Sequence, residues 1–298
     1  MLTIFSVPKA FRGHIGVIQR NAVKSWTLLR PRPEIILFGK DEGAAECAGE
    51  FGARYEPEIA TNQYGTPLLN DMFRRAESAA SHPWIWYVNA DILVLNNFMD
   101  AFTQVSRRLQ KFLLVTERIN MDIREPIKFT AGWEQRFLRL SREQGVPCGT
   151  TGIDIFAYPR GFYSRIPDFS LGRLWFDQWL IKAAREMRAP VVDASRVASV
   201  LHQNHDYNHV PGGAEWVWKG KEAEQNLALY GEKPHAYTLL DVTHDLLPDG
   251  RLQRVRLRCQ RAAVNSFLWK TVLEPTKGIR HRLGLRRGPS RKNAAAKA

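Results

Sequence analysis

The alternation of short apolar runs with segments of helical periodicity constrains the fold of this chain more than any other feature. Strands are expected at residues 3–7, 34–38, 84–88 and 112–116. Between them, apolar side chains recur at helical spacing over residues 15–29, 44–51, 66–76 and 98–109. Strands that alternate with helices of this length form βαβ units. The sequence therefore predicts an α/β fold with a mainly parallel sheet and helices on both faces.

The second half of the chain is less regular. Helices are expected at residues 129–143 and 173–187, and strands at 153–157, 191–193 and 198–201. The helix that begins near residue 66 carries a start signal, with Thr66 as N-cap and Pro67 at the first helical position. In open parallel sheets, ligands bind beyond the carboxyl ends of the strands. The loops after Val7, Phe38 and Val88 are therefore expected to line a site.

Basic residues are concentrated at the end of the chain. Residues 251–298 hold 14 of the 43 lysines and arginines but one of the 30 acids, so the first 250 residues carry no net charge. A dedicated nucleic-acid binder shows basic charge on its folded face, so nucleic acid is not an expected partner. We expect one folded domain over residues 1–250 and a basic tail over 251–298, which begins with an amphipathic helix at 252–273.

The cysteines and the apolar runs indicate the cellular compartment in which the protein is expected. Cys47, Cys148 and Cys259 lie far apart, which suggests neither a disulfide framework nor a zinc site. No run approaches the ~18 apolar residues of a membrane span, and the first residues do not resemble a secretory signal. These features predict a cytoplasmic protein.

An acid stands directly after the predicted strand at 84–88, in the sequence Asn89-Ala90-Asp91. Hard divalent cations prefer carboxylate and phosphate oxygens as ligands. The small side chain of Ala90 leaves room for a diphosphate and its metal ion. The competing interpretation is that Asp91 only caps the next turn, as Asp commonly does after a strand.

Histidines cluster after the predicted strand at 198–201. His202, His205 and His209 are three of the eight histidines in the chain. Histidine is a frequent metal ligand and acid or base, and His202 is expected to emerge at the strand end. The alternative is a polar surface loop. A separate zinc site is disfavoured, because no cysteine or helical i, i+4 spacing accompanies the histidines.

Two further acids lie in surroundings that suit a site. Asp177 follows Trp175 and Phe176 near the start of a predicted helix. Apolar surroundings raise the pKa of a carboxyl group, which suits a general base. Asp154 follows Gly152, and its carboxylate is expected to accept hydrogen bonds from sugar hydroxyls. The alternatives are a helix N-terminal acid for Asp177 and a plain loop before a strand for Asp154.

The order of these pieces over residues 3–209 resembles the GT-A superfamily of glycosyltransferases, which has a Rossmann-like fold. In that superfamily, an Asp-x-Asp motif at a strand end holds Mn²⁺ or Mg²⁺ against the diphosphate of a nucleotide sugar. Asn89-Ala90-Asp91 matches this motif with Asn in the first place. The resemblance implies that Asp91 binds the metal, that Asn89 contacts a ribose, and that His202 or His205 completes the metal shell. We expect Asn89→Asp to keep or improve metal affinity.

The resemblance also implies roles for the rest of the site. Asp177 would be the catalytic base. The nucleotide would be bound by Pro8, Phe11, Arg12, Gly65, Thr66 and Asn70. The acceptor would be bound by Gly152, Asp154 and Trp175.

The activity implied by this resemblance is metal-assisted transfer of a sugar from a nucleoside diphosphate sugar, with a UDP-sugar favoured, to a hydroxyl group. The acceptor would be a glycan, a lipid or a small molecule, and a base at Asp177 implies inversion. One alternative is a nucleotidyltransferase of related fold, which usually has a glycine-rich basic loop after its first strand. Here that loop has Lys9 and Arg12 but a single glycine, Gly13, so the nucleotidyltransferase ranks second.

The second alternative is a non-enzymatic module that binds an anionic surface through the basic tail. Basic amphipathic segments bind anionic membrane surfaces. The tail therefore predicts peripheral association with the inner face of the membrane, for an enzyme as well as for a module.

Overall fold

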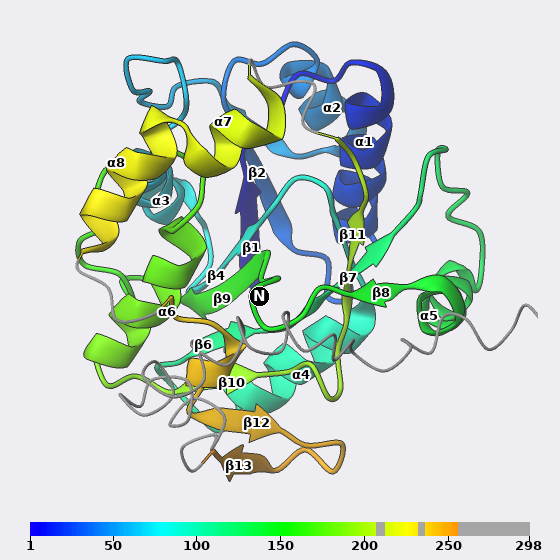
Figure 1. The fold of residues 1–298 in the computed structure, drawn as a ribbon. Coiled ribbons are helices and arrows are strands. Elements are labelled where there is room, and N and C mark those ends of the chain that lie inside the picture. Colours follow the sequence, from blue (N-terminus) through cyan, green and yellow to red (C-terminus); the bar gives the residue numbers. More distant parts are fainter. Residues whose placement is uncertain (207–211, 232–235, 256–298) are drawn as a thin grey trace, which may run out of the picture. The chain divides into compact units, whose positions relative to one another are not determined.

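The computed structural model describes residues 1–206, 212–231 and 236–255 (Figure 1). These residues belong to one compact unit, Met1–Val255. The expected tail beyond Val255 lies outside the described residues, and so does His209. No helix in the described part of the chain is long and apolar enough to cross a membrane.

The main sheet has nine strands among the described residues, in the order β13-β12-β10-β6-β9-β4-β1-β2-β3. Their bounds are β1 Leu2–Ser6, β2 Glu34–Phe38, β3 Arg54–Glu56, β4 Trp84–Val88, β6 Leu113–Val115, β9 Ile155–Pro159, β10 Val191–Asp193, β12 His244–Leu246 and β13 Leu252–Arg254. Strand β9 is antiparallel to both of its neighbours, and β13 is antiparallel to β12. The other pairs are parallel, so the mainly parallel sheet is confirmed.

A smaller sheet has four strands in the described residues, in the order β5-β11-β7-β8. Their bounds are β5 Ile92–Val94, β7 Arg118–Met121, β8 Val146–Pro147 and β11 Val200–Gln203. Only three residues, 89–91, separate the end of β4 from the start of β5, so this sheet continues from the carboxyl end of a main-sheet strand. The segment 89–91 is therefore held between two strands.

Helices cover both faces of the main sheet, as predicted (Figure 1). On one face, a core cluster joins the sheet to α1 Gly13–Thr27, α2 Ala44–Phe51 and α4 Asn96–Ser106. On the other face, a second cluster joins it to α3 Leu69–Ala79, α6 Phe176–Glu186 and α8 Lys221–Tyr230. Helix α5 Trp133–Gln144 packs on the small sheet. Helix α7 Gly213–Lys219 precedes α8, and a short 3-10 helix spans Leu239–Asp241.

Strand β4 shows why the predicted strands are continuous apolar runs. Ile85 and Tyr87 belong to the core cluster on one face, whereas Trp86 and Val88 belong to the cluster on the other. All four side chains are buried. Successive strand side chains point to opposite faces, so a strand covered on both faces needs apolar residues at every position.

Two predicted element boundaries are wrong because chain pairing overrides local signals. Helix α3 begins at Leu69, not at Thr66-Pro67. Pro67 and Leu68 instead form bridges with Thr61 and Ser170, which hold them extended. The predicted helix from residue 252 is also wrong at its start, since Leu252–Arg254 forms β13 and pairs with β12.

Candidate active site

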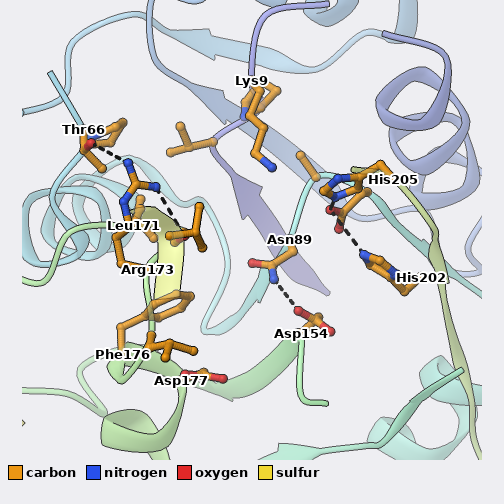
Figure 2. Close-up of a pocket in the computed structure, with 18 of the residues that line it drawn as sticks. Lys9, Thr66, Asn89, Asp154, Leu171, Arg173, Phe176, Asp177, His202 and His205 are labelled. Atoms are coloured by element: carbon orange, nitrogen blue, oxygen red, sulfur yellow. Dashed lines mark hydrogen bonds and ion pairs between the residues drawn. The ribbon is translucent and has the colours of Figure 1, made fainter. Parts of the chain in front are cut away.

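A cavity of about 590 Å³ opens at the carboxyl ends of β1, β2 and β4 (Figure 2). This is the edge of the sheet at which the sequence predicts a ligand. The structure brings ten of the predicted site residues to its lining: Pro8, Gly65, Thr66, Asn89, Asp91, Gly152, Asp154, Asp177, His202 and His205. Most of them are far apart in the sequence, so the fold itself assembles this set.

Four predicted site residues do not line the cavity. Phe11 and Arg12 lie beside it at the start of α1, where Arg12 is exposed and forms an ion pair with Glu42. Asn70 donates a hydrogen bond to Asp168 at 2.6 Å. Trp175 precedes α6 with φ of 88°, and its ring packs on Tyr230.

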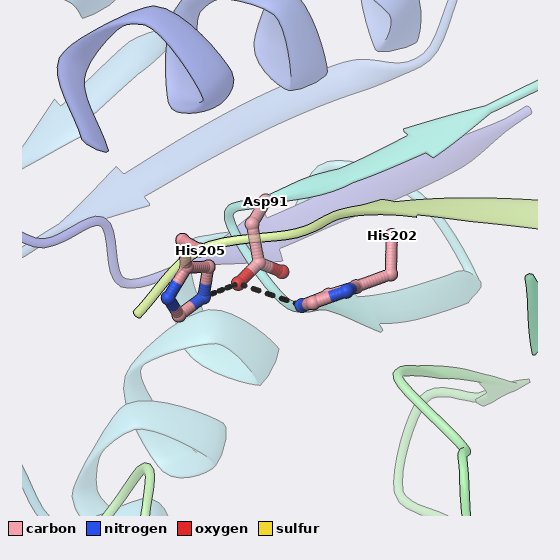
Figure 3. Close-up of side chains that lie close together, drawn as sticks. All are labelled: Asp91, His202 and His205. Carbon is pink, nitrogen blue, oxygen red and sulfur yellow. Dashed lines mark hydrogen bonds and ion pairs between the residues drawn. The ribbon is translucent and has the colours of Figure 1, made fainter. Parts of the chain in front are cut away.

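Asp91, His202 and His205 form a compact cluster at the cavity wall (Figure 3). One ligand atom from each residue lies within 4.8 Å of the other two. The Oδ2 atom of Asp91 is 3.0 Å from Nε2 of His205 and 3.8 Å from Nε2 of His202. The structure thus brings both candidate histidines to the predicted metal-binding acid.

Strand pairing explains how residues more than 100 positions apart meet. Strand β11 runs antiparallel to β5, and His202 is paired with Ile92, the neighbour of Asp91. Gln203 continues this register, since its amide hydrogen and its side chain both donate to the Asp91 carbonyl. His202 therefore lies within β11 rather than after it, which corrects the predicted strand end.

The electrostatics of the cluster fit a cation. Burial by itself raises the pKa of Asp91, but the hydrogen bond from His205 and the nearby His202 and Lys9 lower it overall. Burial lowers the pKa of His202, which favours the neutral, ligating form. Within the described part of the chain, Asp91 Oδ1 and His202 Nδ1 are buried without a hydrogen-bond partner. A divalent cation suits this set of carboxylate and imidazole donors.

Asn89 and Asp154 form a hydrogen-bonded chain with their neighbours. Asn89 donates to Asp154 through its side-chain amide and accepts from the Tyr87 hydroxyl at 2.7 Å. The second carboxylate oxygen of Asp154 is 2.8 Å from Arg118. The sequence predicts that Asn89 and Asp154 contact ligands. Each nitrogen and oxygen atom of these two side chains already has a partner within the protein. Gly152 has a packing role, because a Cβ there would lie 2.4 Å from the Cys148 side chain.

Asp177 lies in the first turn of α6 and lines the cavity (Figure 2). Burial raises the pKa of its carboxyl group to about 7, although hydrogen bonding from the Gln178 backbone opposes this change. The nearby charge of Asp154 raises the pKa further. A carboxylate with this pKa accepts a proton effectively near neutral pH, as the sequence predicts for a base.

Four charged residues of the cavity were not assigned to the site from the sequence: Lys9, Asp41, Arg118 and Arg173. Lys9 and Asp41 follow β1 and β2, so the strand-end rule pointed to their loops without selecting them. Arg173 carries no local signal. It is 2.7 Å from Glu222, a fully buried acid in α8 that also accepts from Asn62. Only the tertiary structure reveals that pairing.

No protein-family description and no curated protein sequence matches this chain. Solved structures do match. Glucosyl-3-phosphoglycerate synthase from Mycobacterium tuberculosis, in complex with Mn²⁺, UDP and phosphoglyceric acid, is 13% identical over 77% of this chain and 76% of its own, with a TM-score of 0.45. TarS from S. aureus, in complex with UDP-GlcNAc, is 10% identical over 70% of this chain and 60% of its own, with a TM-score of 0.44.

The first of these structures contains UDP with Mn²⁺, and the second contains UDP-GlcNAc. Their identities and TM-scores are too low for their activities to be transferred to this chain. The residues of the cavity itself carry the evidence for its function.

Proposed function

We propose that this chain is a metal-assisted glycosyltransferase that uses a nucleoside diphosphate sugar. The observation that carries the proposal is the Asp91, His202 and His205 cluster in the same cavity as Asp177. The cluster suits a cation and the phosphates that the cation binds, whereas Asp177 suits a proton acceptor. Both lie at the edge of the sheet where α/β folds bind ligands.

Asp91 would hold the divalent ion together with His202 and His205. When bound, Mn²⁺ or Mg²⁺ neutralises charge on the leaving diphosphate as a Lewis acid. Pro8, Gly65 and Thr66 line the part of the cavity that we assign to the nucleotide. A UDP-sugar is the favoured donor.

Asp177 would act on the acceptor. Its carboxylate takes the proton of the acceptor hydroxyl while the hydroxyl oxygen forms a bond to the anomeric carbon. The bond from that carbon to the diphosphate oxygen breaks, and the nucleoside diphosphate leaves with the electron pair. A single displacement of this kind inverts the anomeric centre.

Asn89 and Asp154 take a different part in this proposal from the one that the resemblance implies. Their side chains bind each other, Tyr87 and Arg118. We assign them to holding the loop before Asp91 in place. The acceptor, whether glycan, lipid or small molecule, would then be positioned mainly by groups around Asp177.

The test is turnover by the purified full chain. UDP-, GDP- and dTDP-sugars are incubated with and without Mn²⁺, and release of the nucleoside diphosphate is measured. A glycosyltransferase releases the nucleoside diphosphate, and EDTA suppresses this release. Release of pyrophosphate from a nucleoside triphosphate and a sugar phosphate would instead identify a nucleotidyltransferase. No turnover and no nucleotide binding would favour a binding module.

A further inference from the structure

Two hydrogen bonds fix the backbone of Lys9 in the loop that follows the carboxyl end of β1. Its backbone amide donates to Oε1 of Gln19 at 2.7 Å, and its carbonyl accepts from Nε2 of the same side chain at 2.8 Å. Gln19 is buried in α1. This double hydrogen bond fixes the loop and directs the Lys9 side chain into the cavity (Figure 2).

Lys9 differs from the two arginines that line the same cavity. Arg118 is 2.8 Å from Asp154, and Arg173 is 2.7 Å from Glu222. Each arginine therefore has a protein carboxylate that neutralises it. Within the described residues, the Lys9 ammonium has neither a hydrogen bond nor an ion pair. Asp91 is close enough to influence Lys9, but it is already hydrogen-bonded to His205.

An ammonium in this position is costly for the protein alone. Burial lowers the pKa of Lys9, which reflects the loss of hydration of its charge. Lys9 is only partly exposed, and an unpaired charge that loses hydration on folding destabilises the fold. Such charges recur at sites that bind a ligand of opposite charge. Among the described residues, the Lys9 ammonium is therefore a cation of the cavity that no carboxylate pairs with.

We propose that Lys9 binds phosphate oxygens of the nucleoside diphosphate and neutralises it alongside the metal held by Asp91. The inference rests on the proposed function, because that function supplies the diphosphate. A role for Lys9 also fits the presence of Asn89 where the Asp-x-Asp motif has its first acid. A site with one acid in place of two attracts a metal ion less strongly, and Lys9 would supply part of the positive charge that the diphosphate needs. Diphosphate binding in this protein would then persist in part without metal.

The test compares Lys9→Met with the full wild-type chain by calorimetric titration of inorganic pyrophosphate, UDP and uridine, in Mn²⁺ and in EDTA. Methionine keeps the length of the side chain and removes its charge. A hydrogen bond to a charged group contributes about 1.5–3 kcal/mol, so we expect pyrophosphate and UDP affinity to fall by about 10- to 100-fold in both conditions. Uridine affinity should not change.

Thermal unfolding separates a binding role from a structural one. Lys9→Met removes an unpaired charge, so its melting temperature without ligand should equal or exceed that of the wild type. Lys9→Arg keeps the charge and should retain part of the pyrophosphate affinity. Lys24→Met is the matched control, because Lys24 lies over the Phe51 ring and does not line the cavity. It should bind pyrophosphate like the wild type.

Three results would overturn the inference. Equal pyrophosphate affinity in Lys9→Met and the wild type would remove Lys9 from phosphate binding, while Mn²⁺-dependent UDP binding would leave the proposed function intact. A lower melting temperature for Lys9→Met would assign it a structural role. Absence of UDP and pyrophosphate binding by the wild type itself would overturn the proposed function and the inference together.

Discussion

Asp91 occupies the position on which the proposed chemistry depends most. Its carboxylate contacts His205 through one oxygen, and the other oxygen has no partner in the described residues. Loop 89–91 is short and held between β4 and β5, so the carboxylate has little freedom to turn away. A preorganised ligand of this kind lowers the cost of binding a metal ion.

The first prediction concerns metal binding. Asp91→Ala should lower Mn²⁺ affinity by more than about 100-fold. Even substitution of a residue that only hydrogen-bonds a metal ligand lowers metal affinity by about 10- to 100-fold. His202→Ala and His205→Ala should each raise the Mn²⁺ concentration needed for turnover. Calorimetric titration with Mn²⁺ measures the affinity. Asp100→Ala, at an exposed position of α4, is the control. Wild-type Mn²⁺ binding by Asp91→Ala would disprove the metal site.

The second prediction revises the expectation for Asn89→Asp. The Asn89 amide donates to Asp154, so an acid at this position would place two carboxylates against each other. We expect a loss of about 1–3 kcal/mol in the free energy of unfolding, as for a buried polar group left without its partner. Urea unfolding measures the loss. Adding Asp154→Asn should restore part of it, and failure to do so would mean that the pair does not interact.

The third prediction concerns Asp177 and pH. If Asp177 is the base, Asp177→Asn should lower turnover by about 10²- to 10⁴-fold and leave nucleotide affinity near the wild-type value. The raised pKa, about 7, means that wild-type kcat/KM rises with pH up to about 7 and is level above it. Asp100→Asn should leave turnover unchanged. Wild-type turnover in Asp177→Asn would end the assignment of the base, and a loss confined to the acceptor KM would indicate an orienting role.

The same pKa has a consequence for stability. Folding favours the protonated form of Asp177, because the pKa of its carboxyl group is about 7 in the folded protein against 3.8 for the free group. This contribution to stability is complete below about pH 4 and is lost as pH rises to about 7. Asp177→Asn lacks the titrating group. Its melting temperature relative to the wild type should therefore be higher at pH 8 than at pH 4.

At the scale of elements, α8 supports the cavity wall through one buried acid. Its Glu222 is fully buried and accepts hydrogen bonds from Asn62, Arg173 and Trp216. These residues belong to three other segments of the chain. A helix with a polar sequence therefore buries one acid, and that acid fixes the Arg173 side chain in the cavity wall.

The fourth prediction tests this pairing. Glu222→Gln leaves the charge of Arg173 buried without its counterpart, and breaking a buried pair in this way costs about 3–5 kcal/mol. Chemical unfolding should show this loss. Glu58→Gln removes an acid from the exposed pair with Lys40 and should leave the unfolding midpoint nearly unchanged. Equal effects of the two substitutions would mean that the buried pair does not stabilise the fold.

At the scale of the whole molecule, charge is distributed unevenly along the sequence. Residues 251–298 hold all of the excess basic charge. Strand β13 at Leu252–Arg254 and the packing of Val255 on the core show where a truncation must end. A chain cut after Gly250 would lose a strand of the main sheet.

The fifth prediction concerns the tail and a membrane surface. Each Lys or Arg near an anionic surface contributes about 1 kcal/mol to binding. The full chain should co-sediment with anionic vesicles at low salt, and a chain that ends at Val255 should remain in the supernatant. Vesicles of neutral lipid are the control. Equal sedimentation of both chains with anionic vesicles would exclude the tail as the membrane-binding segment.

Local sequence patterns determined most of the elements. The strands predicted at 34–38, 84–88 and 191–193 have the same bounds in the structure. Burial on both faces of a parallel sheet demands continuous apolar residues, and this demand is visible in a short window of sequence. Elements with weak apolar patterns, such as β3 and the helices α7 and α8, were not predicted. Their stability comes from contacts with distant segments.

The individual residue types of the site were also visible in the sequence, because an acid after an apolar strand and a cluster of histidines stand out. Their meeting was decided by tertiary structure. Asp91 reaches His202 through the register between β5 and β11, and Arg173 reaches Glu222 across 49 positions. Hydrophobic periodicity depends on neighbours along the chain, whereas pairing register and the neutralisation of buried charges depend on residues that become neighbours only after folding. For this reason the sequence indicates where the site lies, and only the fold shows that, among the described residues, Lys9 forms no ion pair with a carboxylate.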